Sequence, residues 1–510
     1  MSFLPFLSAF FLIIIPGLLW VNNKLELNPE KLKFWIMVLS GTSWLLSLIF
    51  FLTSPETRLN PIWDAGGTLL PSLAFSLDWV SSSLILALNS LIFVGVLVGD
   101  YSPRTSAWIT ALGGICGIGL LSDSAYTLAL VWTIIESFHL IVSLKNQTGQ
   151  EGSRNIIMGI IFRLTGPLII ITISLVNVGV GGSQFLTEFD STVGPYLLIA
   201  GLIGFSGWFL FPGNGDRKES VLTPGRYASL IPATLGLMLI TRSAVIITST
   251  SFSPLTLFLL GAVVFLISLL GFLFNLTEKT WGIGLIGLII GSALIADPKA
   301  SLSWGVLYLL PGLLFFQELN TRKNHLIALI LGGIGILPLP FFPAWSGVAI
   351  FAEGLPGLLF ALSTGLILGA MLNQGIRYWR VQRLRSEPVF LMLIIGSALL
   401  ILSQLIISLQ SGFLVVSLES FSFPVTIWIA GPLTLVVALF GDRVPRLKMS
   451  GRGVSSGEFM KTLSTINSVG VTLFDQAVYL ITRLFEGDGG LIWALLIGFL
   501  IITLISLSGG

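Results

Sequence analysis

Apolar runs follow one another along almost the whole chain, and only short polar turns separate them. A helix needs about 20 predominantly apolar residues to cross the hydrocarbon core of a bilayer, which is about 30 Å thick. The pattern therefore predicts an all-α, polytopic integral membrane protein. We expect sixteen transmembrane helices, near residues 3–20, 34–53, 77–98, 105–122, 124–144, 156–178, 194–212, 228–248, 252–276, 280–296, 301–318, 325–352, 355–376, 388–410, 412–440 and 488–509.

The basic residues predict the orientation of these spans, because Lys and Arg collect in cytoplasmic loops. With the N-terminus outside, 22 of the 26 Lys and Arg residues fall in inward loops. Only Arg58 and Lys299 fall in outer loops, while Arg163 and Arg242 lie within spans. We therefore expect both termini on the extracytoplasmic side, in a bacterial plasma membrane.

The chain is predicted to contain three regions. Residues 1–440 form a transmembrane bundle, residues 441–487 a connecting segment on the cytoplasmic side, and residues 488–510 a C-terminal transmembrane helix. Within the connecting segment, Glu458–Phe485 carries apolar residues at helical spacing. Such an amphipathic helix lies at the membrane surface or packs against its own bundle, and we favour packing.

Helix breakers are concentrated in the run 325–352, which contains Pro338, Pro340 and Pro343. Proline removes a backbone donor and clashes with the preceding turn, so we expect a broken helix that lines the protein interior. Gly201–Pro212 is a weaker counterpart. Paired interrupted helices indicate an inverted repeat with a pathway near the midplane, although helix packing alone also explains the glycines of the earlier span.

Few ionisable groups lie deep in the predicted spans. Glu136 and His139 are three residues apart on the fifth span and so share a helix face. They form a candidate proton relay or, alternatively, an interior pair that holds helices together. Arg163 on the sixth span is a candidate partner for Glu136, and that pairing would keep the carboxylate charged and favour a structural role.

Other charged residues are expected near the ends of spans. Asp78 and Arg242 are predicted to be interfacial or to anchor loops, and Arg242 is kept as a further proton-relay candidate. Asp123, Asp297 and Glu353 fall in outer turns, where a solvated carboxylate is the default expectation.

Composition excludes several classes of protein. Hydrophobic residues make up 54% of the chain and charged residues 10%, against about 25% charged in soluble proteins. A net charge of +2 gives no reason to expect nucleic-acid binding. One cysteine, Cys116, and two histidines cannot build the usual zinc or haem sites, and no P-loop is present. We expect no cofactor in this chain.

Several motifs together resemble one family. Leu77-Asp78, the stretch from Trp132 to His139, Thr241-Arg242, the proline-rich run Gly335–Pro343 and the tail Arg483–Gly490 are similar to motifs of the antiporter-like membrane subunits. These subunits are shared by respiratory complex I, membrane-bound hydrogenases and Mrp-type sodium/proton antiporters. The resemblance implies inverted five-helix repeats and places Glu136 at the family's key glutamate.

The chain departs from that family at its basic residues. The resemblance implies a lysine on the seventh span, a lysine or histidine on the eighth, and a lysine or glutamate on the twelfth. Gly194–Pro212 contains no Lys, Ala228–Thr241 contains no Lys or His, and Leu326–Phe351 contains no Lys, Glu or Asp. A buried lysine can store and release a proton near neutral pH, so the predicted proton pathway is incomplete.

Two classes of function follow from these observations. The first is a divergent antiporter-like subunit of an energy-converting complex, with a scaffolding or residual proton-translocating role through Glu136. Its partners would be other membrane subunits and the lipid bilayer, and any enzymatic activity would belong to the assembly. The second is an independent secondary transporter that uses the broken helix. A narrower variant of the first is the membrane partner of an inorganic-carbon uptake complex.

Overall fold

The computed structural model of the chain describes residues 3–25, 29–53, 57–63, 73–98, 102–145, 150–179, 181–210, 224–247, 252–273, 277–311, 326–381, 389–410, 412 and 424–441. The chain divides into two units, Met1–Val444 and Pro445–Gly510. All of the described residues belong to the first unit. The predicted connecting segment 441–487, beyond its first residue, and the predicted last span in 488–510 lie outside the described residues.

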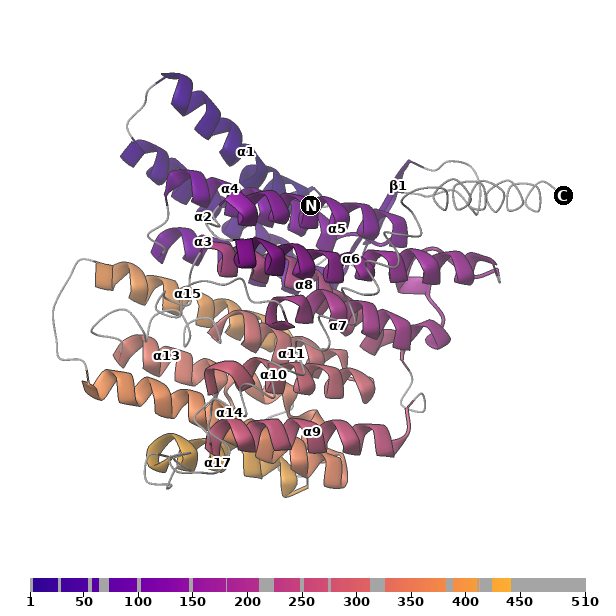
Figure 1. Cartoon of the computed structure of the whole chain (residues 1–510), viewed down its shortest axis with the longest axis vertical. Coiled ribbons are helices and arrows are strands. Elements are labelled where there is room, and N and C mark those ends of the chain that lie inside the picture. Colours follow the sequence, from indigo (N-terminus) through magenta and orange to yellow (C-terminus); the bar gives the residue numbers. More distant parts are fainter. Residues whose placement is uncertain are drawn as a thin grey trace. The chain divides into compact units, whose positions relative to one another are not determined.

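The first half of this unit contains eight long helices and a small sheet (Figure 1). The elements are α1 (Leu4–Leu25), α2 (Pro29–Thr53), β1 (Thr57–Trp63), β2 (Leu73–Leu77), α3 (Trp79–Val98), α4 (Pro103–Leu120), α5 (Ala125–Lys145), α6 (Gln150–Gly179), the 3₁₀ turns η1 (Leu186–Glu188) and η2 (Ser191–Val193), α7 (Gly194–Leu210) and α8 (Pro224–Ile246). α1 packs on α2 and α4, α5 packs on α6, and α7 packs on α8.

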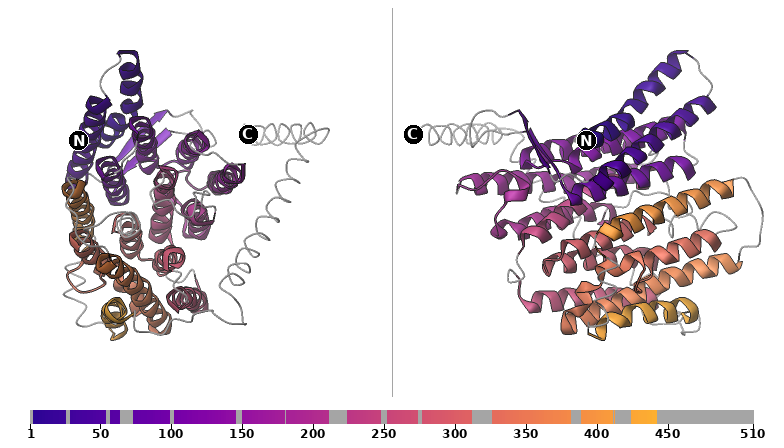
Figure 2. Two further views of the ribbon diagram at one scale, coloured as in Figure 1. Left: turned by 60° about the vertical axis from the view of Figure 1, so that its left-hand side comes forward. Right: turned by 180° about the vertical axis from the view of Figure 1, so that it is seen from behind.

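The second half continues the same arrangement of packed helices, as Figure 2 shows from two further directions. Its elements are α9 (Pro254–Leu273), α10 (Thr277–Leu294), α11 (Pro298–Leu309), α13 (Leu326–Ile336), the 3₁₀ segment η3 (Pro343–Ala352), α14 (Gly354–Val381), α15 (Val389–Gln410) and α17 (Thr426–Phe440). α9 packs on α10 and α14, and α14 also packs on α17.

The predicted all-α membrane fold is confirmed, since each predicted span before residue 441 contains a described helix. Among the described residues, five helices are long and apolar enough to cross a bilayer: Lys31–Thr53, Trp79–Val98, Gly159–Gly179, Pro254–Leu273 and Gly354–Arg377. Shorter apolar helices lie beside them, such as Ala125–Ile141 and Leu230–Ile246. The span predicted over 412–440 is described as a helix from Thr426 onward.

A two-stranded sheet is the one departure from an all-helical chain among the described elements. β1 pairs antiparallel with β2, with Thr57 opposite Leu77 and Leu59 opposite Phe75. Except for Leu77, both strands lie between the predicted spans 34–53 and 77–98. The β2 backbone also bonds to the turn after α4, because Ser76 N donates to Leu121 O at 2.8 Å. The sheet therefore covers one end of the first helices.

The interruption expected over Gly201–Pro212 is not present in its described part, because α7 runs as a continuous helix to Leu210. Its glycines serve close packing instead. A Cβ on Gly201 would lie 2.8 Å from Gly236 O, and one on Gly236 would lie 2.6 Å from Gly201 O. The backbones of α7 and α8 are therefore in contact, as small residues allow in membrane helices. The packing alternative is the correct one here.

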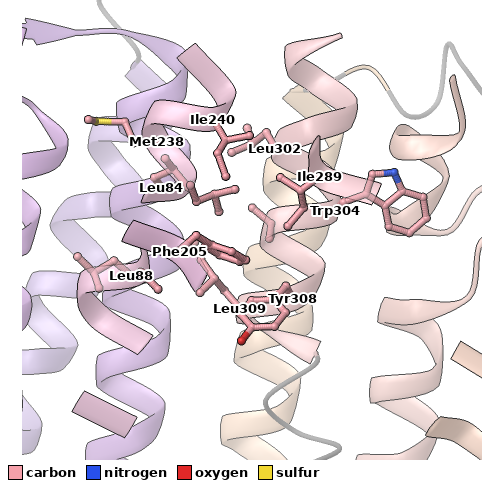
Figure 3. Packing of buried hydrophobic residues seen from close by; sticks show 14 of the residues in the cluster. Leu84, Leu88, Phe205, Met238, Ile240, Ile289, Leu302, Trp304, Tyr308 and Leu309 are labelled. Carbon is pink, nitrogen blue, oxygen red and sulfur yellow. The ribbon is translucent and has the colours of Figure 1, made fainter. Parts of the chain in front are cut away.

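The middle of the bundle is filled by aromatic and aliphatic side chains (Figure 3). Tyr308 on α11 lies with its ring centroid 5.0 Å from that of Phe205 on α7 and 5.0 Å from that of Trp281 on α10. All three side chains are buried. Rings at this separation attract each other beyond the burial of their area, so this interface is closely packed.

We expect Gly236→Ala to lower the free energy of unfolding by about 1–3 kcal/mol, the usual cost of overpacking a filled interior. The added methyl group would meet the α7 backbone, which cannot move as a side chain can. Gly117→Ala is a matched control, since its Cβ would meet only the Ala9 Cβ at 3.9 Å. Thermal unfolding in detergent measures both variants. Equal stabilities would contradict backbone contact between α7 and α8.

Asp297 caps the N-terminus of α11 rather than lying free in a solvated turn. Its Oδ1 accepts a hydrogen bond from Ala300 N at 2.9 Å. Burial raises the pKa of this carboxyl group above its usual value, and hydrogen bonds from the backbone of Ala300 and Lys299 oppose that rise. The folded chain therefore binds the Asp297 proton more tightly than the unfolded chain does.

A raised pKa in the folded state means that stability falls as pH rises between the unfolded and the folded pKa values. We expect Asp297→Asn, which keeps an acceptor and has no charge, to gain stability relative to the native chain from about pH 3 to about pH 7. Asp297→Ala should follow the same pH trend relative to the native chain but lie about 1 kcal/mol below Asp297→Asn at every pH, because the cap is lost. Thermal unfolding across this pH range tests the pair. A pH-independent difference for Asp297→Asn would contradict the raised pKa.

Candidate functional site

The buried charges of the fifth and sixth spans form one cluster. Glu136 and His139 project from α5 and Arg163 from α6, and each has at most 5% of its surface exposed. Arg163 Nε donates to Glu136 Oε1 at 2.8 Å, and Arg163 Nη2 lies 3.0 Å from His139 Nδ1. The structure thus brings together three of the predicted site residues.

The i and i+3 spacing on α5 explains why one guanidinium can reach both partners. His139 Nδ1 lies 3.7 Å from Glu136 Oε2, which is beyond hydrogen-bond distance. Glu136 Oε2 has no hydrogen-bond partner among the described residues. The two carboxylate oxygens therefore differ: Oε1 is bound by Arg163, and Oε2 is an unused acceptor.

Trp132, one turn before Glu136 on α5, completes the cluster. Its Nε1 donates to Glu136 Oε1 at 3.3 Å, and its ring is fully buried. The ring lies in a notch made by two glycines: a Cβ on Gly166 of α6 would come within 2.8 Å of it, and a Cβ on Gly204 of α7 would overlap it. A side chain at position 204 therefore has no room to reach Glu136.

This geometry limits the proton chemistry of Glu136. A guanidinium stays protonated under all physiological conditions, so Arg163 cannot exchange a proton with the carboxylate. A buried ion pair is also strongly coupled, since removing one partner leaves an uncompensated charge in an apolar interior. The cluster is therefore suited to joining α5 to α6 with both charges retained.

A second polar contact lies between α4 and α8. The Cys116 Sγ lies 3.1 Å from Thr234 Oγ1 and 3.2 Å from Ile231 O. Cys116 is fully buried. This thiol acts as a small buried hydrogen-bonding group.

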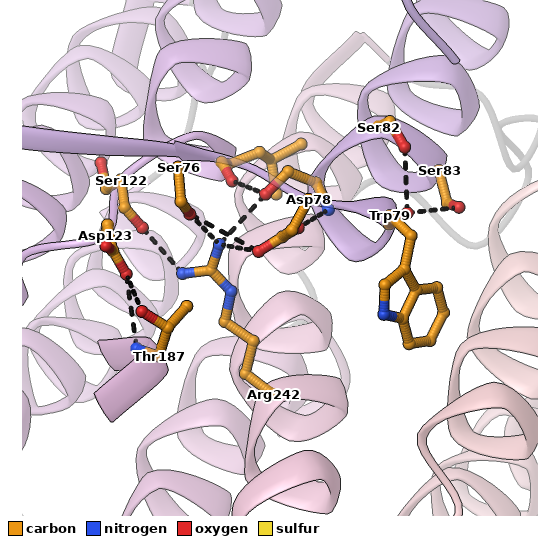
Figure 4. A network of polar contacts seen from close by, with 11 residues as sticks. Ser76, Asp78, Trp79, Ser82, Ser83, Ser122, Asp123, Thr187 and Arg242 are labelled. Carbon is orange, nitrogen blue, oxygen red and sulfur yellow. Dashed lines mark hydrogen bonds and ion pairs between the residues drawn. The ribbon is translucent and has the colours of Figure 1, made fainter. Parts of the chain in front are cut away.

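Arg242 belongs to a separate network at the ends of α3, α4 and α8 (Figure 4). Its Nη2 donates to Asp78 Oδ2 at 2.8 Å, to Ser76 Oγ at 3.0 Å and to Ser81 Oγ at 3.1 Å, and its Nη1 donates to Ser122 O at 2.8 Å. The anchoring role expected for Asp78 and Arg242 is what the contacts support, and Arg242 lies outside the Glu136 cluster.

Asp123 is part of the same end of the bundle, and the expectation of a solvated turn is wrong for it. Its side chain is fully buried, and its Oδ1 accepts a hydrogen bond from Thr187 Oγ1 at 2.9 Å. Leu186 N and Ala74 O bond to its backbone. The reason is tertiary: β2 and the segment before α7 fold over this turn. Nothing in the local sequence around Ser122 and Asp123 predicts that these other segments bury the Asp123 side chain.

The predicted broken helix is present. α13 ends at Ile336, η3 begins at Pro343, and the helical hydrogen bonds do not continue between them. Pro338 and Pro340 lie in this break, where Phe341 has a positive φ of 66°. The prolines remove donors from the very turns that a continuous helix would need.

Side chains of neighbouring helices bind the carbonyl groups that the break leaves free. Gln404 Nε2 of α15 donates to Gly335 O at 2.8 Å, and Ser408 Oγ of α15 donates to Pro343 O at 3.2 Å. Trp304 Nε1 of α11 donates to Gly347 O at 2.9 Å. A backbone inside a membrane protein must be satisfied in this way. Gln404 and Ser408 are one helical turn apart in an apolar span, a signal that the sequence interpretation did not use.

Comparison with known proteins agrees with this fold. No family model matches the chain, and no curated protein matches it. A chain in the structure of the Mrp complex from Dietzia sp. DQ12-45-1b aligns with a TM-score of 0.61 and 13% identity, over 100% of this chain and 63% of that chain. The two chains share a fold. The predicted resemblance to antiporter-like membrane subunits is confirmed at that level.

Two other structures align over 86% of this chain. Respiratory complex I from Thermus thermophilus with bound NADH gives 16% identity, 99% coverage of its chain and a TM-score of 0.44. A chain of the membrane-bound sulfane sulfur reductase, an archaeal respiratory membrane complex, gives 15% identity, 98% coverage of its length and a TM-score of 0.49. The chain spans about two thirds of the Mrp complex chain, 63% of its length. At 13% identity the likeness to the Mrp complex chain concerns the fold and not the roles of residues.

The ion pair generates a test of its structural role. Arg163→Met should lower the free energy of unfolding by about 3–5 kcal/mol, because it leaves Glu136 charged and buried without its partner. The double variant Glu136→Leu with Arg163→Met should recover most of that loss. Thermal unfolding in detergent gives both values. A double variant no more stable than the single one would mean that the pair is not coupled.

Proposed function

We propose that this chain is a divergent antiporter-like membrane subunit whose work is to scaffold and seal the membrane part of a multi-subunit energy-converting complex. The observation that carries the proposal is the contact of Arg163 Nε with Glu136 Oε1 at 2.8 Å in the buried interior. A permanently charged partner holds the carboxylate that a pump would have to load and unload.

The surroundings of this ion pair support a sealing role. Resemblance to the family implies a lysine on the seventh span that exchanges a proton with the fifth-span glutamate. In this chain the facing position on α7 is Gly204, and the Trp132 ring occupies the space in front of it. Further along, Phe205, Tyr308 and Trp281 fill the interface of α7, α10 and α11. Apolar rings at these positions oppose a continuous file of water.

The transporter alternative depends on the break between α13 and η3. A solute needs polar groups near the midplane to replace its hydration. The carbonyl groups of Gly335, Pro343 and Gly347 are already bound by Gln404, Ser408 and Trp304. These contacts favour a structural break over a solute site. The inorganic-carbon variant stays within the proposed class, since that subunit would also act inside an assembly.

We propose that the chain lies in a lipid bilayer and assembles there with other membrane subunits. Support comes from the shared fold with a chain of the Mrp complex and from the apolar helices. The bacterial plasma membrane and extracytoplasmic termini are part of the proposal, and they rest on the distribution of Lys and Arg alone.

Proteoliposomes test the seal directly. We expect the purified chain, reconstituted alone, to leave the decay of an imposed pH gradient within about twofold of empty liposomes, with or without added Na⁺ or K⁺, because aromatic rings fill the described interface of α7, α10 and α11. A pH-sensitive dye inside the vesicles follows the decay. Accelerated decay that depends on a cation would contradict the proposal and favour an independent antiporter.

The assembly is tested in the membranes in which the chain is made. We expect a tagged chain to be extracted as a particle well above its own 55.0 kDa, with partner membrane proteins in fixed stoichiometry. The charge-free double variant Glu136→Leu with Arg163→Met should assemble and leave the number of protons moved per electron unchanged. A chain extracted only as a small homo-oligomer, or a reduced proton ratio in the double variant, would overturn the scaffolding role.

A further inference from the structure

His139 is a buried titratable group that the proposed scaffold does not use. Its side chain is 4% exposed, and its Nδ1 lies between two groups of opposite charge. Arg163 Nη2 is 3.0 Å away, and Glu136 Oε2 is 3.7 Å away. A single ring nitrogen therefore faces both a donor and an acceptor.

The present contact determines which form of the ring the structure holds. A guanidinium only donates hydrogen bonds, so Nδ1 must accept the bond from Arg163 Nη2. A neutral imidazole that accepts at Nδ1 carries its proton on Nε2. In this arrangement the cluster contains one positive charge, on Arg163, and one negative charge, on Glu136.

A second arrangement lies close in space. If Nδ1 gains a proton it becomes a donor and can no longer accept from Arg163. Glu136 Oε2 has no hydrogen-bond partner among the described residues, so it is open to a donor. Closing the 3.7 Å separation to a charge-assisted bond of about 2.8 Å requires a shift of about 0.9 Å. A small rotation of the ring supplies a movement of this size.

We propose that His139 is a proton-binding site that changes partner, accepting from Arg163 when the ring is neutral and donating to Glu136 Oε2 when it is protonated. The Nδ1 lone pair forms the new N–H bond with a proton from a solvent hydronium ion, whose O–H bond breaks to leave water, and no other side chain gains or loses a proton. This inference does not depend on the proposed scaffolding role, because it concerns only contacts within the chain.

The charges around His139 define what controls this site. Glu136 on α5 favours the imidazolium, whereas Arg163 on α6 opposes it. Of the other elements packed against α5, α4 contributes the buried Cys116 and, near its first turn, Arg104. α8 contributes Arg242, which is held by Asp78, and β2 contains no titratable residue. Among the described side chains, Glu136 and Arg163 are the charged groups within 4 Å of the His139 Nδ1.

The position of the ring also gives the proton a short route. His139 is six residues before Lys145, the last residue of α5, which corresponds to about 9 Å of helix. That end of α5 leads to a loop predicted to face the cytoplasm. Glu136 lies one turn deeper and is covered by Trp132 and Arg163.

Nitrogen NMR can observe this site almost in isolation, because the chain has only two histidines. The experiment uses the full chain with His325→Gln, labelled with ¹⁵N-histidine and reconstituted in lipid bilayers. His139→Gln confirms the assignment. Spectra are recorded from about pH 8 to about pH 4, a range that brackets ordinary histidine titration.

We expect a neutral ring with its proton on Nε2 at about pH 8, and an imidazolium that replaces it as the pH falls. In Glu136→Gln the ratio of imidazolium to imidazole at a given pH should fall at least about tenfold, because the carboxylate that stabilises the cation is gone. A neutral ring with its proton on Nδ1, or no imidazolium at about pH 4, would overturn the proposal. So would an unchanged titration in Glu136→Gln. The position of the proton on the neutral ring and the presence of imidazolium at about pH 4 are both measured without changing Glu136 or Arg163. These two measurements therefore test the proposal even if Glu136→Gln does not fold.

Discussion

The contact of Arg163 with Glu136 is the interaction on which the interior of the first helices depends. Two opposite charges lie buried between α5 and α6, and neither can be left alone without a large free-energy penalty. The pair fixes α5 against α6 at one level. Trp132 then bonds to the same carboxylate oxygen, and its ring sets how closely α6 and α7 approach, through Gly166 and Gly204.

The same constraint explains the two other polar regions. A membrane interior offers no water to satisfy backbone or charged groups, so each must be satisfied by the protein. Arg242 binds Asp78, Ser76, Ser81 and the Ser122 carbonyl group, and thereby joins the ends of α3, α4 and α8 to the small sheet. At the break before η3, Gln404 and Ser408 provide the partners that the prolines remove.

These regions together describe a bundle whose polar groups mostly bind one another. A proton pathway requires groups that change charge and water that connects them. Here the guanidinium groups are permanent charges, and aromatic rings fill the interface of α7, α10 and α11 (Figure 3). His139 is the member of the Glu136 cluster whose ring exists in both a neutral and a protonated form. The chain therefore combines an antiporter-like fold with a largely immobilised set of charges.

The sequence alone determined the order of the helices, the break at the prolines and the pairing of Glu136 with His139 on one helix face. Apolar runs set the order and approximate positions of the spans because a membrane helix must be long and apolar, and the prolines set the break because they lack a backbone donor. The spacing of Glu136 and His139 placed both on one face of α5. Only tertiary structure decided the rest, since it depends on contacts between segments far apart in the chain. It showed that Arg163 binds Glu136, that Asp123 is buried beneath β2, and that the glycines of α7 serve packing, because each depends on which surface the neighbouring helix presents.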